Sequence, residues 1–223
     1  MDFGRRRSRP EGTRYSHGSV LDHVFLGVIG ALRRAFEGGF LERQAFEERF
    51  QADVLLGDLS WETSYSLPGE GTPPRVRVDV SLDWPTWSQS AYRSWLMGEG
   101  TDDADGAEKP EIGIEIVLRI QRLATRPELD AVLAVLPAHS PVIGGDELDR
   151  TGHTVEESYG PDVGQRHIAV EVSYEGTYCV EEALANSDLL EKHFGAMGGW
   201  VCSTLVRLGD LKLNYLPPGT PDL

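Results

Sequence analysis

The stretch Arg75–Asp83, RVRVDVSLD, places apolar residues at positions 76, 78, 80 and 82 and polar residues between them. Strict alternation of this length predicts a strand that buries one face and exposes the other. Residues 112–120 and 168–174 repeat the pattern, with isoleucine, leucine, valine and tyrosine at every second position. Half-buried strands of this kind are typical of antiparallel or mixed sheets. These three stretches therefore decide the fold class.

Helical segments and weaker strands are predicted around them. Apolar residues recur at helical spacing over 20–36, and Gly38-Gly39 ends that run. A second helical run over 40–51 would form a hairpin with the first, or continue it past a kink. Further helices are predicted from Pro85, from Pro127 to Leu136, and over 180–194 and 196–208, with weaker strands at 61–67, 151–159 and 211–215.

Together these elements predict a single α+β domain, with helices packed on one face of a largely antiparallel or mixed sheet. The similar strings VDVSLD (78–83) and VEVSYE (170–175) are open to two interpretations, a weak internal duplication or the common pattern of a half-buried strand. We expect the domain to span 20–216, with a disordered basic tail at 1–19 and a flexible C-terminus at 217–223. An acidic loop at 98–110 and an irregular segment at 137–150 lie within it.

Length and composition exclude several classes of protein. The 223 residues are 40% hydrophobic and 26% charged, which is typical of soluble globular chains. No apolar run approaches the roughly 20 residues of a membrane helix, and residues 1–19 lack the apolar core of a secretory signal. We therefore expect a cytoplasmic protein. Arginine outnumbers lysine 18 to 3, which favours a GC-rich bacterial source.

The net charge of −15 is unevenly distributed. The tail carries five arginines against two acidic residues, so the rest of the chain carries −18. This strongly negative part of the chain repels nucleic acids and anionic membranes, and it favours a basic protein partner. If the protein contacts nucleic acid at all, we expect the contact at the arginines of the tail. The alternative is a tail without a function. These arginines are Arg5, Arg6, Arg7, Arg9 and Arg14.

The polar sides of two strands supply candidate binding residues: Asp79, Ser81 and Asp83 in one, and His167, Glu171, Ser173 and Glu175 in the other. If the two strands were neighbours, these residues would share one surface. That surface could bind a divalent cation, or pair an acid of raised pKa with an ionised base. The alternative is a solvent-exposed face whose acids form cross-strand ion pairs with Arg75, Arg77, Arg119 and Lys212.

The segment 83–95 is unusually rich in aromatic residues. Trp84, Trp87, Ala91 and Trp95 are spaced to share one stripe of a helix that Asp83 would cap, and Tyr92 lies in the same segment. Tryptophan suits both interface hot spots and helix-on-sheet cores. In a core, Trp95→Ala would cost about 3–5 kcal/mol, and at an interface it would weaken binding instead.

No catalytic or cofactor motif is present. Residues 101–112 resemble a calcium loop, but Thr101 and Ile112 occupy ligand positions where acids are required, so we interpret them as a solvated loop. Cys179, at the end of a strand before a predicted helix, is the better candidate for a reactive thiol, and Cys202 lies in an apolar helical pattern. We expect no metal and no cofactor.

These observations favour a non-catalytic protein–protein interaction module, similar in role to immunity inhibitors or assembly subunits. The alternative is a small-ligand-binding protein or metal-dependent enzyme with a pocket between sheet and helices. Its polar contacts would come from the candidate acids and His167, and its lining from the tryptophans. The sequence does not identify the partner, the strand order or the oligomeric state.

Overall fold

The three alternating stretches form the centre of a seven-stranded antiparallel sheet with the order β1-β3-β4-β5-β7-β6, in which β2 also pairs with β3. The computed structural model describes residues 18–44, 48–53, 57–97, 109–159, 166–180 and 187–218. The strands are β1 (Glu42–Arg43), β2 (Arg49–Ala52), β3 (Leu59–Ser66), β4 (Val76–Trp84), β5 (Glu111–Leu123), β6 (Asp149–Tyr159) and β7 (Arg166–Cys179). The helices are α1 (Gly18–Gly38), α2 (Thr86–Leu96), α3 (Leu129–Leu133) and α5 (Ser187–Gly209).

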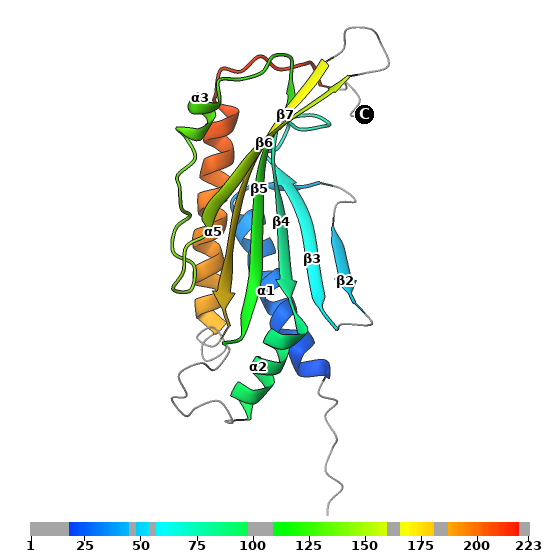
Figure 1. Cartoon of the computed structure of the whole chain (residues 1–223), viewed down its shortest axis with the longest axis vertical. Helices are drawn as coiled ribbons and strands as arrows, with labels where there is room; N and C mark the ends of the chain where they lie inside the picture. The colour runs from blue at the N-terminus through cyan, green and yellow to red at the C-terminus, as the bar shows by residue number, and fades with distance from the viewer. Residues whose placement is uncertain are drawn as a thin grey trace, which may run out of the picture.

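Two long helices cover one face of this sheet. In Figure 1, α1 and α5 lie behind the strands, so the viewer looks onto the opposite face. Val78 and Val80 of β4, with their counterparts on β5 and β7, are buried together with Phe25, Phe36 and Phe194 of the two helices. The residues between these buried ones point away from the helices, onto the opposite face of the sheet, which we call the open face. The predicted α+β fold, with helices on one face of an antiparallel sheet, is confirmed.

The two helices pack closely because small residues lie where they meet. A Cβ atom added to Gly198 of α5 would lie 2.7 Å from the Cβ of Ala35 in α1. One turn further along, the Cys202 thiol donates a hydrogen bond to the carbonyl oxygen of Gly39 at 2.8 Å. The glycine-rich run 195–199 therefore belongs within one continuous helix, α5, where the sequence suggested two helices.

The predicted helix over 40–51 is wrong. The chain turns at Phe40, which is 83% exposed and has a φ of 64°, and residues 42–43 and 49–52 then pair with β3. Backbone pairing with an otherwise unpaired sheet edge outweighs the weak helical pattern, as tertiary context often does. The predicted last strand is reduced to one bridge between Leu123 and Tyr215.

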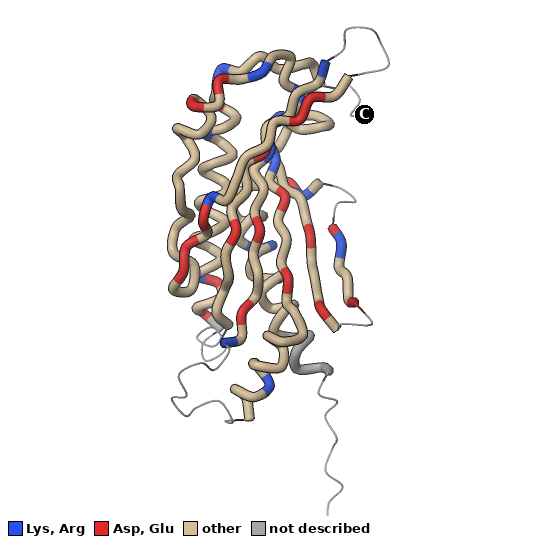
Figure 2. Tube along the Cα trace, viewed as in Figure 1, with Lys and Arg blue, Asp and Glu red and all other residues tan. Residues whose placement is uncertain are grey.

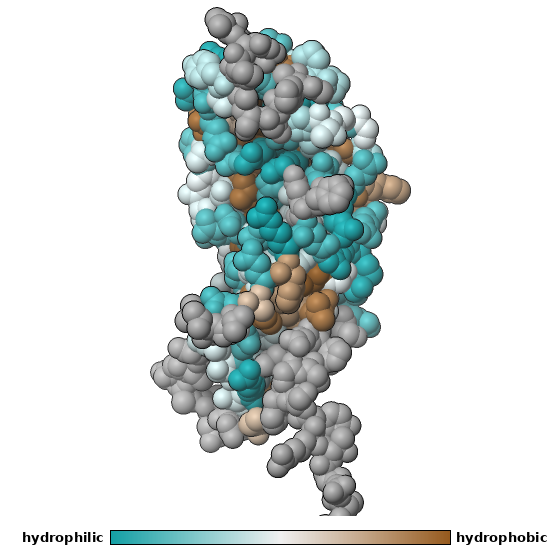
Figure 3. Space-filling model, turned by 90° about the vertical axis from the view of Figure 1, so that its right-hand side faces the viewer, coloured by the Kyte–Doolittle hydropathy of each residue, from teal (hydrophilic) through white to brown (hydrophobic). Residues whose placement is uncertain are grey.

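Residues 1–17, most of the predicted basic tail, lie outside the described residues, as do 98–108 of the acidic loop and 219–223 of the C-terminus. Among the described helices, none combines the length and the apolarity needed to cross a membrane. Figure 3 shows the side that bears β2, which is mostly hydrophilic apart from a hydrophobic patch in its lower half.

The close approach at Gly198 predicts opposite effects for two neighbouring glycines. Gly198→Ala forces the new methyl group against Ala35, and we expect the free energy of unfolding to fall by about 1–3 kcal/mol. Gly199 has no atom within 4 Å of an added Cβ. Gly199→Ala should therefore raise the free energy of unfolding, by up to about 1 kcal/mol, because alanine favours helices. Urea denaturation of both variants measures the difference; equal gains would contradict the close helix contact.

Candidate functional site

The open face brings the polar sides of β4 and β7 together, although the two strands are not neighbours. Both pair with β5, which lies between them. The register places Glu62, Ser81, Glu115 and Glu175 in one row across β3, β4, β5 and β7. A second row runs through Ser66, Arg77, Arg119, Glu171 and Thr154. Figure 2 shows acidic positions on each of the strands β3, β4, β5 and β7.

Ion pairs join residues of the second row and link it to Asp79 in the neighbouring row. Arg119 on the central strand pairs with Glu171 of β7 and lies 3.9 Å from Asp79 of β4. Arg77 lies 3.1 Å from the same Asp79 carboxylate, which also accepts a hydrogen bond from Ser64. Two of the candidate acids, Asp79 and Glu171, are thus brought to one arginine, as the ion-pair alternative expected.

The other two basic residues of the ion-pair alternative, Arg75 and Lys212, lie elsewhere. Arg75 lies beside the turn before β4 and pairs with Glu70 at 2.7 Å, with its guanidinium 5.2 Å from the ring centroid of Tyr215. Lys212 follows α5 and is off the sheet. Arg77 and Arg119 therefore supply ion pairs in the middle of the open face, whereas Arg75 and Lys212 do not.

The remaining acids form what we call the acidic cluster: Glu62, Asp83, Glu115 and Glu175. Glu115 lies directly opposite Glu175 in the pairing of β5 with β7, and like charges in that position repel. Asp83 lies one row further along β4, opposite Gly113. At the sheet edge, Arg49 of β2 lies opposite Glu62.

The closely spaced carboxylates change the pKa values of two residues of the acidic cluster, Glu115 and Asp83. Partial burial raises the pKa of Glu115, and the nearby carboxylates of Glu175, Asp83 and Glu62 raise it further. Partial burial likewise raises the pKa of Asp83, with added repulsion from Glu62 and Asp58. Both shifts mean that the folded chain disfavours the charged form. The acidic cluster thus carries negative charge that its own surroundings do not fully compensate.

His167 does not join these acids. It lies near the start of β7, at the opposite end of the open face, where it lines a cavity with Arg77 and Arg119. Among the described residues, no group of three or more His, Cys, Asp or Glu side chains is placed to hold a metal ion. The convergent site of acids and histidine considered from the sequence is therefore not formed.

The tryptophan segment divides between core and surface. Trp84 is the last residue of β4 and is fully buried, with its ring centroid 5.9 Å from those of Phe25 and Tyr92. Trp87 is 48% exposed, and Trp95 is partly buried and stacks on Tyr92. Because Trp84 belongs to the strand, the expected stripe along one helix is not formed.

The buried side of α2 is partly polar, because Ser88 and Gln89 are buried there beside Tyr92. Ser88 accepts a hydrogen bond from the Trp84 indole at 3.1 Å, and Gln89 donates to the Trp84 carbonyl oxygen at 2.9 Å. Asp83 does not cap this helix. Asp58 does so from the loop before β3, accepting hydrogen bonds from the backbone N–H and the hydroxyl of Thr86 at 2.7 and 2.9 Å.

The two cysteines are not joined by a disulfide and lie in different settings. Burial raises the pKa of Cys202, which packs between α1 and α5. Cys179 ends β7, and residues 181–186, where the sequence predicts the start of a helix, lie outside the described residues. The calcium-like loop at 101–112 lies largely outside the described residues.

Sequence reasoning missed Arg122. The pairing of β5 with β7 shifts between Ile120 and Leu123, and Arg122 within this bulge has a φ of 58°. The signal was present, because apolar alternation stops at Ile120 and resumes three residues later at Leu123. A three-residue step within a strand is what an inserted residue produces.

The chain matches no protein-family model, no curated protein and no solved structure.

The division of the tryptophans predicts unequal effects on stability. Trp84→Ala removes a fully buried ring and should lower the free energy of unfolding by about 3–5 kcal/mol. Trp87→Ala removes an exposed ring from the same segment and should change it by less than about 0.5 kcal/mol. Urea denaturation measures both. Comparable losses would mean that Trp87 is covered in solution.

The raised pKa values predict a pH dependence. The pKa of Glu115 is higher in the folded chain than in the unfolded chain. At pH values between these two pKa values, the folded chain therefore binds more protons than the unfolded chain. Stability from this group therefore falls as pH rises through that window. Glu115→Gln should raise the free energy of unfolding by about 0.2–1 kcal/mol at neutral pH, which is the usual size of a cross-strand pair interaction.

The gain should shrink on acidification towards the ordinary pKa of a glutamate, and urea denaturation at two pH values measures it. Glu128→Gln removes the same charge from an exposed position at the start of α3 and is the control, with no gain expected at neutral pH. A gain for Glu115→Gln that is the same at both pH values would contradict the assigned repulsion.

Proposed function

We propose that this protein is a non-catalytic binding module of the bacterial cytoplasm, which docks a basic segment of a partner protein on the acidic cluster of its open face. The observation that carries the proposal is the row Glu62–Ser81–Glu115–Glu175, with Asp83 beside it, on a sheet face that α1 and α5 leave uncovered. The role would be that of an inhibitor or of a subunit in an assembly.

Electrostatics supports a cationic partner. Glu115 and Asp83 repel their neighbours and are less acidic than usual, so their surroundings favour an added positive charge. A lysine or arginine side chain placed among them would relieve the repulsion that the free protein retains. The two carboxylates would then bind it better in the complex than isolated surface acids do.

The geometry supports an extended or flat partner surface. Strand spacing in a sheet is about 4.8 Å. The acid on β3 therefore lies two strand spacings from the acid on β5, which lies one spacing from the acid on β7. Arginine forks can form two parallel hydrogen bonds with a carboxylate. The net charge of −15 adds long-range attraction, which speeds encounter with a basic partner and weakens as salt rises.

The proposal is tested with an oligo-arginine peptide, and a citrulline peptide of equal length as the uncharged control. Titrated into isotope-labelled protein at low salt, the arginine peptide should shift backbone amide signals around residues 60–62, 81–83, 113–115 and 175–177. Added salt should reverse the shifts, and the citrulline peptide should produce none.

Matched variants locate the binding surface. Glu115→Gln should weaken the peptide's affinity several-fold, whereas Glu128→Gln, which also removes one negative charge, should have little effect. Signals that move only in the acidic loop at 98–110, or equal losses in both variants, would show that the peptide follows net charge rather than the acidic cluster.

A further inference from the structure

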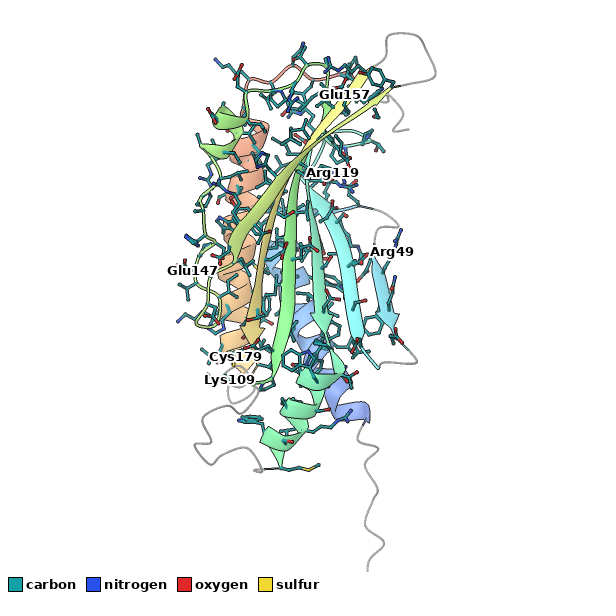
Figure 4. The ribbon with its side chains drawn as sticks, in the orientation of Figure 1. Arg49, Lys109, Arg119, Glu147, Glu157 and Cys179 are labelled. Carbon is teal, nitrogen blue, oxygen red and sulfur yellow. The ribbon has the colours of Figure 1, made fainter. Side chains whose placement is uncertain are left out.

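The other end of the open face contains a cavity of about 610 Å³. In Figure 1 β6 and the upper part of β7 slant across the upper ends of β5 and β4, and residues from all four strands line this cavity. Figure 4 labels Arg119 on the sheet below this crossing and Glu157 on β6 above it. The volume lies within the usual range for small-ligand pockets.

The lining of this cavity has an unusual charge for so acidic a protein. Three arginines contribute to it from two adjacent strands: Arg77, Arg119 and Arg122. His167, Ser158 and Gln121 add groups that can donate hydrogen bonds. We call this site the arginine cavity.

Two carboxylates also line the arginine cavity, both on β6. Glu157 is already paired with Arg166 at 2.6 Å, and Glu156 is exposed. The acids therefore lie along the β6 wall, whereas the arginines come from the floor formed by β4 and β5.

The backbone of β5 is distorted where it supplies one of these arginines. Arg122 sits in the bulge with a φ of 58°, a conformation that side-chain-bearing residues rarely adopt. Its side chain is nevertheless only 4% exposed, and its carbonyl oxygen accepts a 2.7 Å hydrogen bond from Leu216. Strained residues at bulges cluster at functional sites, where the bulge redirects a side chain.

Among the described residues, one buried nitrogen of His167 and one of Arg119 have no hydrogen-bond partner, and both residues line the arginine cavity. His167 is only 9% exposed, and its Nε2 atom has no partner. The Nε atom of Arg119 is also buried without a hydrogen bond. It lies 3.9 Å from the Asp79 carboxylate, and the other end of that guanidinium pairs with Glu171. Buried polar groups are rarely left unpaired, because losing water without a replacement is costly.

We propose that the arginine cavity binds a small molecule through an oxyanion, a phosphate or a carboxylate group held by Arg119, Arg122 and His167. Planar guanidinium groups suit both anions, since each presents two parallel donors. The bound anion would also supply the missing partner for a buried nitrogen. This site is separate from the acidic cluster, and the proposal does not depend on the proposed function.

The test is isothermal titration calorimetry with pyrophosphate and with citrate, each compared with potassium chloride at equal ionic strength. We expect at least one of the two anions to bind with a dissociation constant of about 1 mM or lower. Preference for pyrophosphate assigns a phosphate compound, and preference for citrate assigns a carboxylate. Failure of both anions to bind overturns the proposal, whatever the outcome of the oligo-arginine experiment.

Two variants distinguish a ligand site from a structural one. Arg119→Gln should weaken anion binding about 10- to 100-fold, and Arg93→Gln, which removes a charge from an exposed position of α2, should leave it unchanged. His167→Phe fills the same space without the unpaired nitrogen. It should weaken binding while the melting temperature stays equal or rises.

A merely structural His167 predicts the opposite pattern, a lower melting temperature with binding intact. That pattern, or equal weakening by Arg93→Gln and Arg119→Gln, would overturn the proposal. The His167→Phe arm keeps the test decisive if Arg119→Gln fails to fold.

Discussion

Burial of one face of the sheet against α1 and α5 is the constraint on which the other features depend. Along β4, β5 and β7, every second side chain is committed to the core, and the residues between them must then lie on the opposite face. A slip of one residue would place Arg77 and Asp79 beneath the helices, where unpaired charges are very costly. The core thereby specifies the composition of the open face.

The order of the strands then decides how charges on that face interact. Because β5 lies between β4 and β7, Arg119 reaches acids on both sides and neutralises the middle of the face. Two rows away the central residue is Glu115, which lies opposite another glutamate instead. The same alternation thus yields an ion-paired row in one place and an acidic cluster in the next. At the far end, the bulge and the slant of β6 gather arginines around a cavity.

Residues that failed to follow their local pattern show where sequence reasoning ends. The run 40–51 has apolar residues at loosely helical intervals, yet an unfilled edge of β3 recruits part of it as strands. Trp84 fits a helical stripe by spacing, but β4 continues through it and carries its ring into the core. In both cases the deciding partner is distant in sequence, so no local period could reveal it.

The sequence by itself determined the central strands, their buried faces and the amphipathic helix α1, because periods of two and 3.6 residues are written directly in the order of side chains. It also determined which acids and arginines share a side within each strand. Only the tertiary structure decided that β5 separates β4 from β7, that Arg119 joins Asp79 to Glu171, and that His167 and Arg122 meet at one cavity. Strand order and bulge geometry arise from contacts between segments far apart in the chain, and local spacing does not encode them.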